Sequence, residues 1–287
     1  MKNIGKKIKN LVYYWPIIPF LLLIVFVELS PVGNIILKSF FTDSGKFGLD
    51  NFAVVFSRKI YQVTIINSLK LAFIVTMVGL LIAFLGGIAV SASSAGVKNF
   101  FMSILNMSLE FSGIPLAFAF IIILGSSGVI TSLARTVNLD WIANFDLYSF
   151  AGLILVYVYF EIPLGTLTLL PAFEGIKKEW QESAELMNAS RVQFWTRIGV
   201  PVLLPSLIGT FAFLFADALT AYATLYALVL NNIPVLPTKI AACFTGESFP
   251  KEGLGSALTV VMILIICIVL ITSSLLRKAL VKGRQSS

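Results

Sequence analysis

Three acidic side chains, Glu110, Glu161 and Asp217, lie inside long apolar stretches, where a charged group is costly. Carboxylates in such positions usually face the interior of a helix bundle or a water-filled cavity. Tyr222 follows Asp217 closely and adds a hydroxyl group. We predict that these four residues line a polar pathway through the protein. The alternative is that the carboxyl groups only form hydrogen bonds inside the bundle.

The residue inventory argues against catalysis on this chain. It has no histidine, and its two cysteines, Cys243 and Cys267, show no metal-ligand spacing. It also lacks the G-x-x-x-x-G-K-[ST] loop that holds the phosphates of ATP in one large class of ATPases. We therefore expect no catalytic residue, no metal site and no cofactor on this chain.

The composition predicts an all-α integral membrane protein. Of the 287 residues, 58% are hydrophobic and 12% are charged, whereas soluble domains carry about 25% charged residues. A membrane-spanning helix needs about 20 mostly apolar residues. Six stretches meet this requirement: Tyr14–Ile36, Thr64–Ala92, Phe100–Gly125, Ser149–Leu170, Val200–Ala227 and Leu254–Leu276.

The distribution of Lys and Arg predicts that both termini are cytoplasmic. With this orientation, 13 of the 21 basic residues lie on the cytoplasmic side, in agreement with the excess of basic residues found there in membrane proteins. The same excess accounts for the net charge of +7 without nucleic-acid binding. The apolar run Leu11–Val27 lacks a small-residue cleavage site, so we expect an uncleaved first helix rather than a signal peptide. We expect a single membrane domain over residues 1–287.

A charged segment, residues 171–199, separates the fourth and fifth apolar stretches. Residues 177–187 have helical character, and Trp180, Ala184 and Met187 share one face. Asn188 suits a helix end, because Asn tolerates the left-handed conformation. Ser190 and Gln193 have the spacing of a capping box that starts a second short helix. We predict a helix–turn–helix on the cytoplasmic face.

The spacing in this segment resembles the cytoplasmic EAA loop of ABC-importer permeases, E-A-A-x3-G-x9-I-x-L-P. Four of seven pattern positions are identical and three are conservative departures; the seven are Glu182, Ser183, Ala184, Asn188, Ile198, Val200 and Pro201. The segments Phe47–Phe52 and Asn67–Leu69 are also similar to segments of that family. The resemblance covers about residues 60–276. It is strongest to the type I importers of the polyamine, iron, thiamine and phosphonate branch.

The resemblance implies a six-helix type I permease fold in the bacterial cytoplasmic membrane and a role as the solute pathway of an ATP-driven importer. In that family the loop docks on a separate ATPase. The residues implied to couple to it are Glu182, Ser183, Ala184, Met187, Asn188, Ala189, Ile198 and Pro201. The implied partners are two ATP-binding subunits that hold ATP and Mg²⁺, a second permease that is identical or homologous, an extracellular or periplasmic solute-binding protein, and membrane lipid.

The acidic residues add one expectation about the solute. If they line the pathway, a cationic or hydrogen-bond-rich solute such as a polyamine is favoured. The alternative function is a secondary transporter driven by an ion gradient. Such a transporter would explain the buried acids, but it would not explain the charged loop, and inverted repeats would then be expected.

Overall fold

The structure of the chain is a computed structural model that describes residues 17–42, 45–229, 232–245 and 251–285. Helices form nearly all of its regular structure, with one isolated bridge between Phe41 and Phe47. In chain order the helices are α2 (Ile17–Ile24), η1 (Val25–Leu29), α3 (Ser30–Ser39), α4 (Asp50–Ser57), α5 (Lys59–Ser91), α6 (Ala95–Glu110), α7 (Ile114–Leu124), α8 (Val129–Thr136), α9 (Asp140–Ala143), α10 (Phe150–Glu174), α11 (Lys178–Leu186), α12 (Arg191–Phe194), η2 (Trp195–Gly199), α13 (Val200–Thr220), α14 (Ala223–Val229), α15 (Leu236–Thr245) and α16 (Glu252–Gln285).

Six helical stretches within the described residues are long and apolar enough to cross a membrane. They are Ile17–Ser39, Lys59–Ser91, Ile114–Thr136, Phe150–Glu174, Arg191–Thr220 and Glu252–Lys282. The predicted all-α membrane architecture with six spans is therefore confirmed. The start of the first predicted span, Tyr14–Ile36, lies outside the described residues.

The chain divides into two compact units, Met1–Lys59 with Ile240–Val261 and Ile60–Lys239 with Met262–Ser287. In the first unit, Asn51 joins the loop after α3 to α4, because its side-chain amide donates to the carbonyls of Ser39 (3.1 Å) and Phe41 (2.9 Å). Lys38 and Glu252 form an ion pair of 2.5 Å that connects α3 to the start of α16. The apolar first span carries no buried residue in its most hydrophobic window, as expected for a lipid-facing helix.

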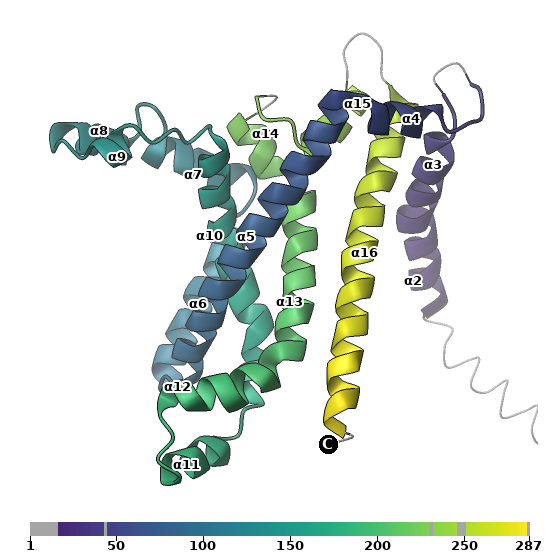
Figure 1. Cartoon of the computed structure of the whole chain (residues 1–287). Helices are drawn as coiled ribbons and strands as arrows, with labels where there is room; N and C mark the ends of the chain where they lie inside the picture. The colour runs from purple at the N-terminus through teal and green to yellow at the C-terminus, as the bar shows by residue number, and fades with distance from the viewer. Residues whose placement is uncertain (1–16, 43–44, 230–231, 246–250, 286–287) are drawn as a thin grey trace, which may run out of the picture. The chain divides into compact units, whose positions relative to one another are not determined.

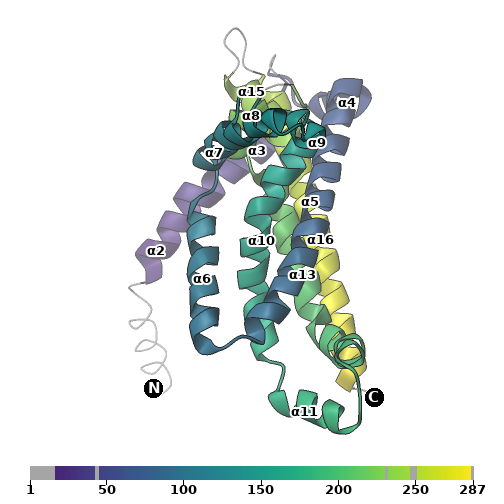
Figure 2. The same cartoon turned by 90° about the vertical axis from the view of Figure 1, so that its left-hand side faces the viewer.

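The second unit is a helix bundle. Helices α5, α6, α10 and α13 run alongside one another, while α7, α8 and α14 lie at one end and α11 and α12 at the other (Figures 1 and 2). Toward the end that carries α11, a core cluster forms from Ala83, Leu169, Phe173 and Leu203, each at most 3% exposed. Lys98 and Glu174 form an ion pair at that end, between α6 and α10. Trp195, at the start of η2, packs against this core cluster, so the helix that follows α11 is joined to the bundle there.

The third predicted span, Phe100–Gly125, is wrong as a single helix. The structure ends α6 at Glu110 and starts α7 at Ile114, and Gly113 between them has φ +71°, a conformation that L side chains rarely adopt. Pro115 occupies the first turn of α7, where a missing N–H costs nothing. The apolar run was continuous enough to hide this break. α6 runs beside the other long helices and α7 and α8 lie at one end of the bundle, so Ile114–Thr136 meets the requirement for a span by length and composition rather than by its position (Figures 1 and 2).

The contact between Gly87 of α5 and Phe173 of α10 provides a test of this packing. A Cβ atom on Gly87 would overlap the Phe173 ring, which also packs against Phe84 and Trp195. We expect Gly87→Ala to lower the stability of the detergent-solubilised chain by about 1–3 kcal/mol, the range typical of overpacking. Thermal unfolding measures the change.

Gly86→Ala is the matched control for that substitution. Its Cβ would lie 3.5 Å from the Thr166 hydroxyl, an ordinary contact, and alanine favours a helix over glycine by up to about 1 kcal/mol. We expect this variant to be as stable as the parent or slightly more so. Equal melting temperatures for the two variants would contradict the close contact at Gly87.

Candidate functional site

The segment from α11 to η2 has the predicted helix–turn–helix form. α11 ends where Asn188 adopts φ +56°. The amide of Asn188 donates to the carbonyl of Glu185 (2.9 Å), and the amide of Ala189 donates to that of Ala184 (3.0 Å). These two bonds form the hydrogen-bonded helix end that a left-handed residue permits. The predicted role of Asn188 as a helix stop is confirmed.

The second helix of the segment starts with the predicted capping box. The Ser190 amide donates to the Gln193 side-chain oxygen (2.8 Å), and the Gln193 amide donates to the Ser190 hydroxyl (3.2 Å). α12 then continues through the π-helix η2 into α13. Within η2, Gly199 lies against the ring of Trp195, and a Cβ atom at this position would overlap the indole. These local contacts set the direction in which the segment leaves the bundle.

A groove of about 720 Å³ runs between α11 and the helix formed by α12, η2 and the start of α13. We call it the α11–η2 groove. Six of the eight predicted coupling residues line it: Ser183, Ala184, Met187, Asn188, Ala189 and Ile198. Trp180, on the same face of α11 as Ala184 and Met187, lines it too, as its spacing predicts. The remaining two predicted residues lie outside its lining.

Those two residues are Glu182 and Pro201. Glu182 is exposed and forms an ion pair of 3.4 Å with Lys178, one turn earlier on α11. Pro201 lies in the first turn of α13, a position that favours proline at a helix start. Pro201 therefore shapes the backbone that follows the groove, while Glu182 presents a charge beside it.

Sequence reasoning did not select Gln193, Phe194, Arg197 and Val202 as site residues, although they form the second wall of the groove. With Ile198 they follow the i, i+4 periodicity of one helix face. That periodicity was available in the sequence. It points to the groove only when α12 and α13 are treated as one continuous helix.

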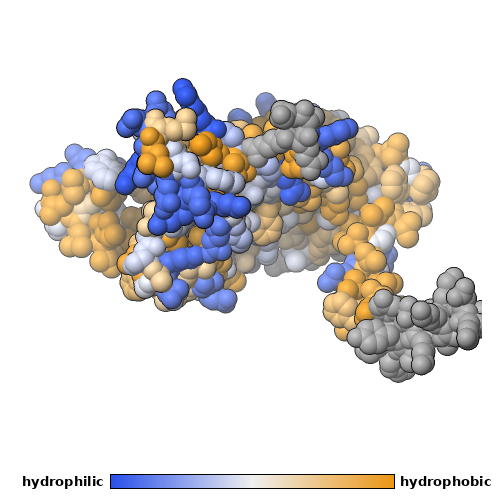
Figure 3. Space-filling view, turned by 90° about the horizontal axis from the view of Figure 1, so that it is seen from below, coloured by the Kyte–Doolittle hydropathy of each residue, from blue (hydrophilic) through white to orange (hydrophobic). Residues whose placement is uncertain are grey.

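The surface around the groove exposes large apolar side chains. Leu186, Met187 and Val192 are 86%, 82% and 71% exposed. Seen from the end of the bundle that carries α11, hydrophilic residues gather over the α11–α12 segment, with hydrophobic residues among them (Figure 3). A mixed polar and apolar surface with a groove at its centre is typical of a protein–protein contact.

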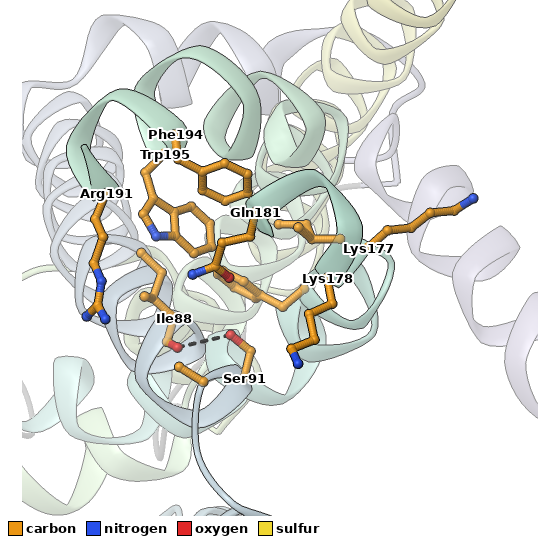
Figure 4. Close-up of a pocket in the computed structure, with 11 residues that line it drawn as sticks. Ile88, Ser91, Lys177, Lys178, Gln181, Arg191, Phe194 and Trp195 are labelled. Carbon is orange, nitrogen blue, oxygen red and sulfur yellow. Dashed lines mark hydrogen bonds between the residues drawn. The ribbon is translucent and has the colours of Figure 1, made fainter. Parts of the chain in front are cut away.

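A second cavity, of about 610 Å³, separates α11 from the ends of α5 and α10 (Figure 4). Phe173, Phe194 and Trp195 form its apolar wall, and Gln181 and Arg191 add polar groups. Lys177 extends away from the other lining side chains (Figure 4). Phe173 belongs to the core cluster at this end of the bundle, and Trp195 packs against that cluster and against Phe194, so the helix of α12 and η2 is joined to the bundle through aromatic contacts.

The predicted pathway residues are only partly brought together. Asp217 and Tyr222 line one cavity of about 410 Å³ near the end of the bundle formed by α7 and α14. Asp217 is half-buried and is the only charged residue among the described residues that line it. Sequence reasoning missed the other polar contributors: Ser112 and Gly113 from the break between α6 and α7, and Thr224.

Hydrogen bonds across the bundle hold the walls of this cavity. The Thr224 hydroxyl donates to the carbonyl of Gly113 (3.3 Å), and the Tyr157 hydroxyl donates to that of Ala221 (2.7 Å). Both acceptors lie at helix breaks, and the Gly113 carbonyl also accepts from the amide of Ala117 in the first turn of α7 (3.2 Å). The breaks therefore give the cavity polar walls.

The other two predicted acids lie outside the lining of this cavity. Glu161 is fully buried in the middle of α10, and its carboxyl oxygens have no hydrogen-bond partner among the described residues. Gly79 of α5 faces it so closely that a Cβ there would lie 2.8 Å from the Glu161 Cβ. Glu110 is exposed at the last residue of α6.

Comparison with known proteins gives relatives of one kind. No model of a known protein family matches the chain. It is 24% identical over 208 residues to the trehalose transport system permease protein SugB of Mycobacterium tuberculosis, covering 72% of this chain and 69% of SugB. It is 22% identical over 173 residues to the thiamine transport system permease protein ThiP of Haemophilus influenzae, covering 60% of this chain and 31% of ThiP. The chain thus matches less than a third of the length of that thiamine permease.

The fold also matches solved structures over nearly its whole length. One is a crystal structure of a bacterial ABC transporter involved in the import of the acidic polysaccharide alginate, with a TM-score of 0.81 and 17% identity, covering 96% of this chain and 99% of that chain. Another is of a bacterial alginate ABC transporter in complex with an alginate pentasaccharide-bound periplasmic protein, with a TM-score of 0.77, 18% identity and coverage of 93% and 94%. The chain is therefore a multi-pass membrane protein homologous to ABC importer permeases, and it has their fold.

Proposed function

We propose that this chain is the membrane permease subunit of an ATP-driven, binding-protein-dependent importer. The observation that carries the proposal is the α11–η2 groove. Its lining includes six of the eight residues implied to couple to an ATPase, in a segment whose spacing resembles the ATPase-docking loop of such permeases. The exposed apolar side chains beside it give a partner a surface to cover.

We propose that an ATP-binding subunit inserts a helix or loop into this groove. An apolar side chain of that subunit would lie against Trp180, Ala184 and Met187. The chain lacks the phosphate-binding loop of these ATPases, so the partner must bind and hydrolyse ATP. ATP-driven closure of two such subunits would then move the α11–η2 segments of two permeases relative to one another.

The further partners are proposed by homology. The alginate transporter was solved with a periplasmic solute-loaded protein, which supports an external binding protein for this chain as well. The second permease is either a copy of this chain or a homologue. We propose that the assembly lies in the cytoplasmic membrane of a bacterium, with the α11–η2 segment and both termini in the cytoplasm.

The solute is not determined by homology, because the similar proteins are named for a vitamin, a neutral disaccharide and an acidic polysaccharide. The polyamine hypothesis rests on Asp217 alone, which is the charged residue of the cavity between α10, α13 and α14. We propose a solute with hydrogen-bond donors, with a cation as the form that Asp217 favours.

The experiment that tests the proposed function is uptake into proteoliposomes that contain this chain with its ATPase and binding protein. ATP enclosed with the ATPase should drive uptake of the loaded solute, and an ATPase unable to hydrolyse ATP should not. An imposed proton or sodium gradient without ATP should give only background uptake. Gradient-driven uptake without ATP would favour the alternative, a secondary transporter, and contradict the proposal.

The orientation has a test of its own. The test uses a background with Cys243→Ser and Cys267→Ala. Ser94 is the residue before α6, which starts at the end of the bundle that carries α11, and Ser127 lies between α7 and α8, which are at the other end (Figures 1 and 2). Both positions are exposed. We expect an impermeant thiol reagent to label Ser127→Cys in spheroplasts and Ser94→Cys only after the membrane is opened. The reverse pattern would invert the proposed topology.

A further inference from the structure

A third cavity, of about 510 Å³, lies between α13 and the C-terminal part of α16. Its lining is mostly basic and hydroxylic: Arg277, Lys278 and Lys282 come from α16, with Ser274, and Ser206 comes from α13. No acidic side chain is among the described residues that line it. We call it the α13–α16 basic cavity.

Two of the cations that line this cavity, Arg277 and Lys278, are not balanced by a carboxylate among the described residues. Lys278 and Lys282 are four residues apart on one helix, where like charges repel. The ligand that best suits basic side chains around a cavity is therefore an anion with several hydrogen-bond acceptor oxygens.

The two helices meet closely at this cavity. The Ser273 hydroxyl donates to the carbonyl of Ile208 (3.0 Å) across the contact. The guanidinium of Arg277 lies over Gly209, because a Cβ built there would be 3.0 Å from one of its nitrogens. Arg277 is exposed, but its guanidinium lies against the backbone of α13, so this cation is placed beside the cavity by the contact between the two helices.

The position of the cavity along α16 indicates where the anion comes from. The apolar part of the Glu252–Lys282 span ends at Leu276, and Arg277 follows directly. On the apolar side of this boundary, Ile271, Leu275 and Leu276 are 56–60% exposed. A phospholipid fits this arrangement. Its phosphate would lie beside the cations at the end of the span, and its acyl chains would lie beside the exposed apolar side chains.

We propose that the α13–α16 basic cavity binds the phosphate group of an anionic phospholipid, with Arg277 and Lys278 as its charged partners and Ser206 and Ser274 as hydroxyl donors. The acyl chains would lie along the exposed apolar face of α16. The bound lipid would link α13, which continues from the α11–η2 segment, to α16. The proposal requires only that the chain spans a membrane and does not depend on the importer function.

The test measures binding of short-chain phosphatidylglycerol to the detergent-solubilised full-length chain by native mass spectrometry and calorimetry. We expect Arg277→Gln with Lys278→Gln to weaken binding by on the order of tenfold or more, because each cation near anionic lipid contributes substantially. Ser206→Trp should weaken it similarly by filling the cavity without changing the charge. The control, Arg58→Gln with Lys59→Gln, removes two exposed charges from elsewhere in the chain and should bind normally.

Two further probes identify the ligand class. Short-chain phosphatidylcholine should bind at least tenfold more weakly than phosphatidylglycerol, and millimolar inorganic phosphate should compete poorly. Competition by inorganic phosphate at lipid-like affinity would retain a phosphate site but assign it to a soluble anion. Equal binding of both lipids, normal binding to Ser206→Trp, or an equal loss in the Arg58 and Lys59 control would overturn the proposal.

Discussion

Ala184→Asp should reduce ATP-driven uptake to background while the chain still inserts into the membrane. Ala184 is 8% exposed and lines the α11–η2 groove. A carboxylate there would be enclosed next to Trp180 and Phe194, without a partner, once an ATPase subunit covers the groove. An unpaired buried charge costs on the order of 2–5 kcal/mol. Co-purification of the ATPase should be lost in parallel with uptake.

Thr196→Asp is the matched control for this prediction. Thr196 is exposed, belongs to η2 and does not line the groove. The same new carboxylate can therefore stay in water, and we expect uptake within about twofold of the parent. Normal uptake by Ala184→Asp would mean that the groove is not a docking surface. An equal loss of uptake in both variants would mean that a negative charge added anywhere in the segment impairs transport.

The α11–η2 segment was predictable because its determinants are local. The left-handed turn at Asn188 and the capping box of Ser190 and Gln193 depend on residues within five positions of one another. Such signals are carried by short stretches of sequence and need no knowledge of the rest of the fold. The groove was only half predicted, because its second wall depends on how α12, η2 and α13 join.

The helix ends near the pathway cavity were less predictable. The fifth predicted span, Val200–Ala227, continues through Ala221, where the structure ends α13 before α14 begins at Ala223. Its apolar composition gave no reason to stop there. The break is held by Tyr157, which is 64 residues away in sequence and donates to the freed carbonyl of Ala221. A long-range contact of this kind has no local signature.

The orientation of each helix about its own axis could not be predicted from the sequence either. Glu161 and Asp217 both interrupt apolar stretches, so hydropathy alone treats them alike. In the bundle, α10 turns Glu161 toward Gly79 of α5, whereas α13 leaves Asp217 at the cavity that Tyr222 also lines. Packing of large against small side chains sets these rotations. Equivalent sequence positions therefore differ in access to a solute.

That difference leads to unequal effects of two conservative amide substitutions. Asp217→Asn should lower uptake at subsaturating solute by about 10- to 100-fold, because a hydrogen bond to a charged group contributes about 1.5–3 kcal/mol. Glu161→Gln should stay within a few-fold of the parent, because Glu161 does not line the cavity. Both amides keep nearly the shape of the acid, so expression and melting temperature should change little.

The comparison is made in proteoliposomes that contain the complete transporter, with uptake measured below and above solute saturation. Basal ATP hydrolysis is the internal control and should survive both changes, because neither residue lies in the α11–η2 groove. A loss confined to low solute concentrations in Asp217→Asn would place Asp217 in solute binding. Parental uptake by Asp217→Asn at every concentration would remove the support for a cationic solute. A larger loss in Glu161→Gln than in Asp217→Asn would place the pathway along α5 and α10 instead, because Glu161 of α10 faces Gly79 of α5.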